Sequence, residues 1–251
     1  MKTTHLILAI NLTMTPVALQ AQNYKIEDWD IRLDLMSSGV LSPVIKEKDP
    51  VLAPPPSPGT SQHEIDLSQA LETNRSAKTP LIKAYMASSE QFDISSSLIA
   101  DGILPPRERA DHFWSILDRA YLDVSLLSLK QKKKFARLRP EASLPGFEVH
   151  IDASATPSYP SLISANMTLF TQLVGSLTDL CEAENGSYAT QMSEARIHGG
   201  VSTQADIDGG AELAAWYLKA LYDSDLWLTH AGSAGREVQD FYREQGCVVP
   251  G

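Results

Sequence analysis

The sequence predicts an all-α fold, a helical bundle with long loops. Apolar residues recur at spacings of three and four in several segments, as they do on the buried face of an amphipathic helix. Strand-like alternation is limited to one short piece, residues 147–151. A chain of 251 residues with 43% hydrophobic residues can bury one core of ordinary size, so a second domain is not required.

Residues 1–21 are expected to be a secretory signal peptide. Lys2 supplies the positive end, an apolar stretch begins at Leu6, and Ala21 offers a small residue for cleavage. The alternative is an ordinary buried N-terminal helix. No later stretch approaches the roughly 20 apolar residues that span a bilayer. We therefore expect a soluble, periplasmic mature protein that has no membrane contact once the signal is removed.

Residues 22–60 are expected to form an irregular arm, and residues 61–251 the helical domain. Charges and short apolar groups in the arm show no helical period, and the proline run of residues 52–59 favours an extended conformation. The helical pattern begins at Ser61 and breaks at Pro80. A second helix opens at Pro105-Pro106, and apolar residues recur in it at helical spacing: Phe113, Trp114, Leu117 and Tyr121.

The clearest helix is predicted for residues 161–181. One face of it carries an apolar stripe made of Leu169, Phe170, Leu173, Val174, Leu177 and Leu180. Asn185-Gly186 is expected to end that element. We expect a further helix to begin near Gln204 or Asp206, and a last, short helix over residues 236–244.

The charge balance limits the class of ligand. A net charge of -10 and a pI near 5.0 argue against a general nucleic-acid binder, which needs a basic face. An acidic protein can still bind an anion in a local pocket where arginine and lysine are concentrated. The two cysteines, Cys181 and Cys247, fit no metal site by their spacing; they predict either one structural disulfide in an oxidising compartment or two buried thiols.

Three separated segments carry the residues of chemical interest. Residues 132–140 read KKKFARLRP, residues 157–161 read PSYPS, and residues 196–206 read RIHGGVSTQAD. Each has a bland interpretation when taken alone. A basic run at a helix end is usually solvated, a serine at a helix start is a cap, and two glycines make a turn.

Taken together, the order and spacing of these segments resemble the three signatures of the type 2 phosphatidic acid phosphatase and haloperoxidase superfamily. Lys132, six residues and then Arg139-Pro140 resemble the first signature, Ser158 to Ser161 the second, and Arg196 to Asp206 the third. The likeness is greatest to the soluble, exported class A nonspecific acid phosphatases, and it covers about residues 50–225. It implies the helical fold of that family and suggests a homodimer.

The resemblance implies a clamp for phosphate or a small phosphomonoester. Position by position, the clamp residues would be Lys132, Arg139, Ser161 and Arg196. Forked guanidinium groups suit this role because they give paired, charge-assisted hydrogen bonds to an anion.

The chain departs from the family at the two catalytic histidines. Ile163 stands at the position of the general acid, and Ser202 stands at the position of the nucleophile. Asp206, which would orient that nucleophile, is retained. Leu162 replaces a glycine and adds bulk beside the phosphate, whereas His150 and His198 are poorly spaced to act as substitutes.

Three interpretations follow. The first is an impaired or inactive phosphatase that binds phosphate without cleaving it, because losing a positioned acid costs about 10²–10⁴-fold in rate. The second is an active acid phosphatase that uses Ser202 or a relocated histidine. The third is a structural or partner-binding protein. No cofactor or metal is expected, because vanadium chemistry on this clamp needs an axial histidine where Ser202 stands.

Overall fold

The computed structural model describes residues 44, 50–76, 80, 82, 98–100, 102–151, 156–177 and 182–246. The expected signal peptide of residues 1–21, most of the arm, and both Cys181 and Cys247 lie outside the described residues.

The described part of the chain is all-α, as predicted, and contains no strand. Its regular structure consists of α2 (Ser61–Arg75), η1 (Arg107–Arg109), α5 (Asp111–Phe135), α6 (Pro140–Ser143), α7 (Leu162–Leu177), α8 (Glu182–His198), α9 (Gln204–Tyr222) and α10 (Asp225–Glu244). None of the described helices combines the length and the apolar character needed to cross a membrane.

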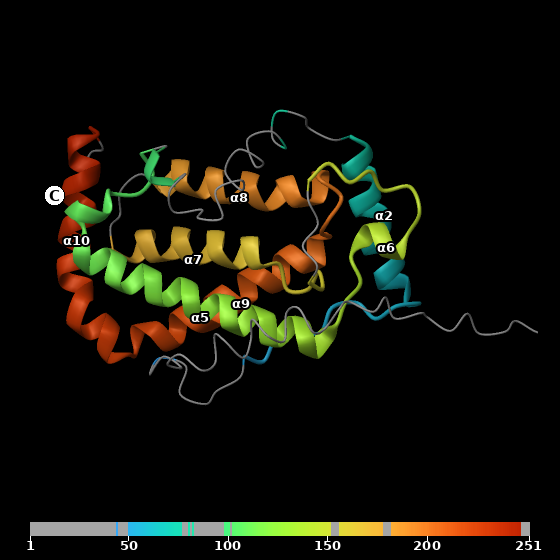
Figure 1. Cartoon of the computed structure of the whole chain (residues 1–251), viewed down its shortest axis with the longest axis horizontal. Helices are drawn as coiled ribbons and strands as arrows, with labels where there is room; N and C mark the ends of the chain where they lie inside the picture. Colours follow the sequence, from blue (N-terminus) through green and yellow to red (C-terminus); the bar gives the residue numbers. More distant parts are fainter. Residues whose placement is uncertain are drawn as a thin grey trace, which may run out of the picture.

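The helices form a bundle around α7. Figure 1 shows α5, α7, α8 and α9 running lengthwise, with α10 across one end and α2 and α6 at the other. Helix α7 packs against α5, α8, α9 and α10. It can do so because apolar residues occupy most of its surface, and the core joins Phe170 of α7 to Phe113 of α5 and Tyr217 of α9, all fully buried.

An extended segment lies outside the bundle, against α9. Residues 50–57 form no helix, and Leu52 is buried. The Ala53 N–H donates to the carboxylate of Glu212, at 3.1 Å from Oε2, and the Ala53 carbonyl oxygen accepts a hydrogen bond from the Tyr159 hydroxyl. The proline-rich part of the arm therefore has fixed contacts with the helical domain.

Three boundaries predicted from the sequence are wrong. Helix α5 begins at Asp111, after the separate turn η1, and not at Pro105-Pro106. Helix α8 runs through Asn185-Gly186, which therefore does not end an element. Helix α10 begins at Asp225, eleven residues before the predicted start at position 236, because the Ser224 hydroxyl caps it by accepting from the Trp227 N–H.

Candidate functional site

The three segments singled out in the sequence meet at the end of the bundle that carries α2 and α6. Lys132, in the last turn of α5, donates from Nζ to the carbonyl oxygens of Pro157 and Ser158, the latter at 3.2 Å. Arg139 donates from Nη1 to the carbonyl oxygen of Val201 at 2.8 Å. These contacts join the first segment to the second and to the third.

Local backbone geometry directs the first segment into the site. Helix α5 ends at Phe135, and its C-cap residue Ala136 has a left-handed φ of 46° and ψ of 36°, which changes the chain direction there. Residues 136–139 are then non-helical, until Pro140 starts α6 at the position that tolerates a missing N–H. Arg139 lies between the two helices, is 4% exposed, and also donates from Nε to the Thr156 carbonyl oxygen.

Ser161 is placed by its contact with α9. Its N–H donates to the Asp206 carbonyl oxygen at 2.9 Å, and its hydroxyl accepts from the Ser164 N–H at 3.3 Å, as an N-cap does. A Cβ at Gly210 would overlap the Ser161 carbonyl oxygen, so α7 and α9 approach this closely only with glycine there. Ser161 itself is 2% exposed.

A glycine turn positions the third segment. After α8 ends at His198, Gly200 adopts a φ of +81°, and a Cβ there would lie 2.5 Å from the Glu148 carbonyl oxygen. Asn74 of α2 holds the turn, because its amide donates to the carbonyl oxygens of Glu148 and His198 at 2.8 Å each. The turn brings Ser202 back to Arg196, whose Nε donates to the Ser202 hydroxyl at 3.4 Å.

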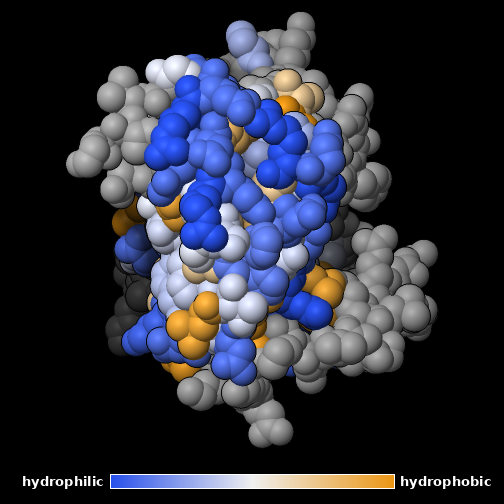
Figure 2. Space-filling model, turned by 90° about the vertical axis from the view of Figure 1, so that its left-hand side faces the viewer, coloured by the Kyte–Doolittle hydropathy of each residue, from blue (hydrophilic) through white to orange (hydrophobic). Residues whose placement is uncertain are grey.

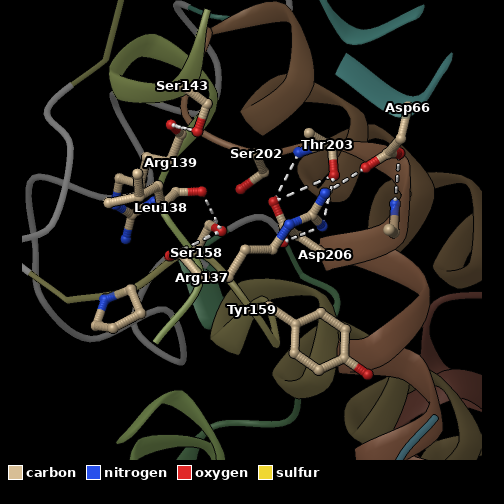
Figure 3. A network of polar contacts seen from close by, with 12 residues as sticks. Asp66, Arg137, Leu138, Arg139, Ser143, Ser158, Tyr159, Ser202, Thr203 and Asp206 are labelled. Atoms are coloured by element: carbon tan, nitrogen blue, oxygen red, sulfur yellow. Dashed lines mark hydrogen bonds and ion pairs between the residues drawn. The ribbon is translucent and has the colours of Figure 1, made fainter. Parts of the chain in front are cut away.

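Asp206 is engaged in a buried ion-pair network that the sequence analysis did not predict. Figure 3 shows the Arg137 guanidinium between the carboxylates of Asp66 and Asp206. Arg137 donates to Asp206 Oδ1 at 2.9 Å and to Asp66 Oδ2 at 2.6 Å. Asp206 also accepts from the Thr203 N–H at 2.8 Å, which caps the start of α9. The carboxylate therefore stabilises the fold and holds Arg137.

The buried side chains of Lys132, Arg137, Arg139 and Arg196 form a cationic cluster at this end of the bundle. Burial lowers the pKa of Lys132 well below its usual range, and the nearby positive charge of Arg139 lowers it further. Arg196 acts in the same direction, while the Asp206 carboxylate opposes them. An anion placed among these groups would favour the charged form of the lysine.

Glu141 is a further residue of this cluster that the sequence analysis missed. It lies in the first turn of α6, two residues after Arg139, and its charge interacts with those of Arg139 and Arg196. Burial raises the pKa of Glu141, and a hydrogen bond from its own backbone N–H together with the two arginines offsets this only in part. A carboxyl group two residues after a predicted ligand, on a one-turn helix, is the signal that could have identified it.

The residues at the two histidine positions provide no acid and no base. Ile163 is half-buried and packs against the hydrophobic core, and Leu162 begins α7 beside it. Ser202 is 1% exposed, and the Arg196 guanidinium that hydrogen bonds to its hydroxyl is a permanent cation that cannot accept a proton.

The two histidines considered as replacements make other contacts. His198 contacts the Thr73 carbonyl oxygen through Nδ1 at 3.1 Å, in α2. The backbone N–H of His150 donates to the Gly199 carbonyl oxygen, and its ring lies 3.7 Å from the exposed carboxylate of Glu148. His198 thus contacts α2, and the backbone of His150 contacts the glycine turn at Gly199.

Two cavities elsewhere do not contain the cationic cluster. One, of about 460 Å³, lies between the start of α5 and α10, and is lined by Arg109, His112, Ser233, Arg236, Glu237, Asp240, Phe241 and Glu244. The other, of about 350 Å³, lies among α7, α8 and α9, and its lining includes Ser164, Thr168, Ser193 and Gln204. Within the described ranges, no group of three or more histidine, cysteine, aspartate or glutamate residues could hold a metal ion.

Comparison with protein-family models gives no match, and comparison with curated proteins gives none either. The resemblance of the three segments to the acid phosphatases therefore stays a prediction from the sequence.

Proposed function

We propose that this chain is an exported protein on the class A acid phosphatase scaffold that binds phosphate or a small phosphomonoester and does not hydrolyse it efficiently. The ligand would be held by Lys132, Arg139 and Arg196, with hydroxyl groups from Ser161 and Ser202. The observation that carries the proposal is the meeting of these cations, from two distant segments, in one buried cluster.

The charge balance of the cluster favours an anionic ligand. Four cationic side chains are gathered there, and the two aspartates beside them, Asp66 and Asp206, both pair with one of the four, Arg137. Burying positive charge is costly unless a negative charge compensates it. A phosphate among Lys132, Arg139 and Arg196 would bring negative charge close to all three and could accept charge-assisted hydrogen bonds from them.

The same geometry argues for binding without efficient turnover. Phosphoryl transfer needs a nucleophile activated by a base and an acid for the leaving group. Ser202 has an arginine beside its hydroxyl, and the Asp206 carboxylate is occupied by Arg137 and Thr203. Ile163 has no proton to give.

Calorimetric titration with inorganic phosphate at mildly acidic pH tests binding. We expect a Kd of about 1 mM or tighter and a loss of at least about tenfold in Arg196→Ala. The matched control is Arg236→Ala, an exposed arginine that lines the cavity beside α10. Equal loss in the control would place the anion in that cavity, and no heat from the parent at millimolar phosphate would refute the proposal.

Hydrolysis of p-nitrophenyl phosphate at mildly acidic pH tests the catalytic part. The mature parent is expected to be inert, and the triple variant Leu162→Gly, Ile163→His, Ser202→His is expected to gain turnover. Turnover by the parent would favour the active-enzyme interpretation. In that case, unchanged activity of Ser202→Ala would exclude serine as the nucleophile.

A specific observation favours a second candidate, a structural or partner-binding protein. Lys132 and Arg139 already donate to backbone carbonyl oxygens, of Pro157 and Ser158 and of Thr156 and Val201. In this candidate the cations hold loops together and bind no ligand. It predicts inertness toward phosphate, a large loss of stability in Arg139→Ala, and a stable oligomer in sedimentation.

A further inference from the structure

Glu141 has a carboxyl oxygen that the fold leaves without a partner. Its Oε2 is buried and makes no hydrogen bond within the part of the chain that the structure describes. A buried polar atom of this kind costs free energy unless something satisfies it. The carboxyl group interacts electrostatically with Arg139 and Arg196, so it lies near the cationic cluster.

The charged groups around Glu141 come from several elements. Arg139 precedes α6, Arg196 lies in the last turn of α8 and Asp206 lies in the first turn of α9, and the charges of all three act on the carboxyl group. Lys132 of α5 interacts with the same three charges. Helix α2 also packs against α6, and its Arg75 approaches the loop after α6 at Gly146.

Protonation decides what this carboxyl group can do to an anion. A protonated carboxyl group donates one hydrogen bond, whereas an ionised one only accepts and repels a second anion. Burial raises the pKa of Glu141 despite two neighbouring arginines, which extends the pH range in which the neutral form persists. When the carboxyl group is protonated, Oε2 can donate a hydrogen bond to an oxyanion in the cluster.

We propose that Glu141 is the proton-bearing ligand of the anion site: its protonated carboxyl group donates a hydrogen bond to an oxygen of bound phosphate or phosphomonoester, and its ionisation weakens binding. This inference rests on the proposed function. It makes the site an acid-favoured one, which holds a tetrahedral oxyanion at low pH and releases it as the pH rises.

The test is the pH dependence of sulfate binding between about pH 4 and about pH 8, because sulfate carries no proton to titrate in that range and a change in affinity therefore reports the protein. Calorimetry compares the full chain with Glu141→Gln, whose amide always donates and is never charged. Glu141→Ala removes the donor, and Glu148→Gln is the matched control because that nearby glutamate is exposed.

We expect the affinity of the parent for sulfate to fall at least about tenfold over that range. Glu141→Gln is expected to lose this dependence, apart from any part due to deprotonation of Lys132, which both chains share. Glu141→Ala is expected to bind weakly at both pH values, and Glu148→Gln to follow the parent. Unfolding curves identify any variant that fails to fold. If Glu141→Ala fails to fold, the comparison of the parent with Glu141→Gln still decides whether Glu141 is a ligand.

Two results would overturn the inference, and they differ in meaning. If Glu141→Gln binds sulfate with the same pH dependence as the parent, then Glu141 is not a ligand and the anion site remains. If no chain binds sulfate or phosphate at either pH, the proposed function fails together with the inference.

Discussion

Both ends of the bundle carry ion pairs between arginine and a carboxylate, but the pairs are buried at one end and exposed at the other. At the α2 and α6 end, Arg137 and its partner Asp206 expose 5% and 0% of their side chains. At the α10 end, Arg109 and its partner Glu244 expose 46% and 60%. Figure 2 views the α10 end, and its described surface is mostly hydrophilic.

This difference determines where charge can matter for function. Exposed ion pairs are surrounded by water and salt, so each contributes little to stability and its residues can be replaced at little cost. Buried charges are costly to leave uncompensated, and their pKa values shift, so they are the ones that can hold a ligand or respond to pH. The α2 and α6 end is therefore the end to examine for function.

The largest effect is expected for Arg137→Ala. It leaves the carboxylates of Asp66 and Asp206 buried without their common partner, which costs about 3–5 kcal/mol of unfolding free energy. The control is Arg243→Ala, which removes the exposed pair with Asp240 and costs about 0.5 kcal/mol or less. Urea denaturation measures both, and similar losses in the two variants would contradict the contrast between the ends.

A second comparison exchanges one glycine at each end. Gly210→Ala would drive a Cβ into the Ser161 carbonyl oxygen and to within 2.9 Å of the Ala165 nitrogen, so we expect a loss of about 1–3 kcal/mol. Gly232→Ala in α10 meets nothing within 4 Å and is expected to gain about 0.5–1 kcal/mol from helix propensity. Thermal unfolding measures whether each variant loses or gains stability relative to the parent. A Gly210→Ala variant as stable as the parent would mean that α7 and α9 can separate without cost.

The smallest effect concerns the opposite pKa shifts of two glutamates. For Glu237, burial raises the pKa, but hydrogen bonds from the Phe113 N–H and from His112 outweigh burial and lower it. The stability that it contributes is present above the unfolded value of about 4.3 and is lost as the pH falls through the folded pKa. For Glu141, with its raised pKa, stability is instead lost as the pH rises above about 4.3.

Glutamine variants of Glu237 and Glu141 measure how each carboxyl group makes stability depend on pH. Relative to the parent, Glu237→Gln is expected to be less stable at about pH 7, by about 1 kcal/mol or less because solvent screens the site, and to recover as the pH falls. Glu141→Gln is expected to gain on the parent as the pH rises. Urea denaturation at about pH 4 and about pH 7 distinguishes them, and a common direction would contradict the assigned pKa shifts.

The start of a helix could be predicted where one short segment of sequence contains both a polar cap and periodic apolar residues. Helix α2 starts at Ser61 and α9 at Gln204, as predicted, because polar caps precede periodic apolar residues there. Helix α8 could not be predicted in this way, since Asn185-Gly186 is a turn signal in the sequence and the helix runs through it. Helix α10 is longer than predicted because Gly232 and Gly235 obscure its period, although the Ser224 cap is visible in the sequence.

The site could be predicted only in part. The three segments were read from their order and spacing, and the structure brings Lys132, Arg139, Arg196 and Ser202 together. The pairing of Arg137 with Asp66 had no local signal, because those residues are 71 positions apart and neither lies in a recognisable pattern with the other. Contacts of that range come from the tertiary fold alone.

The Arg137 network also has a consequence for the order of folding. Arg137 pairs with a residue 71 positions earlier and with another 69 positions later. During synthesis, α2 and α5 emerge well before Asp206 of α9 does, and loops of this size must close before the pairs can form. We expect the packing around Arg137 to stay incomplete until Asp206 has emerged, so that a chain truncated before position 206 retains Lys132 and Arg139 and still has no anion site.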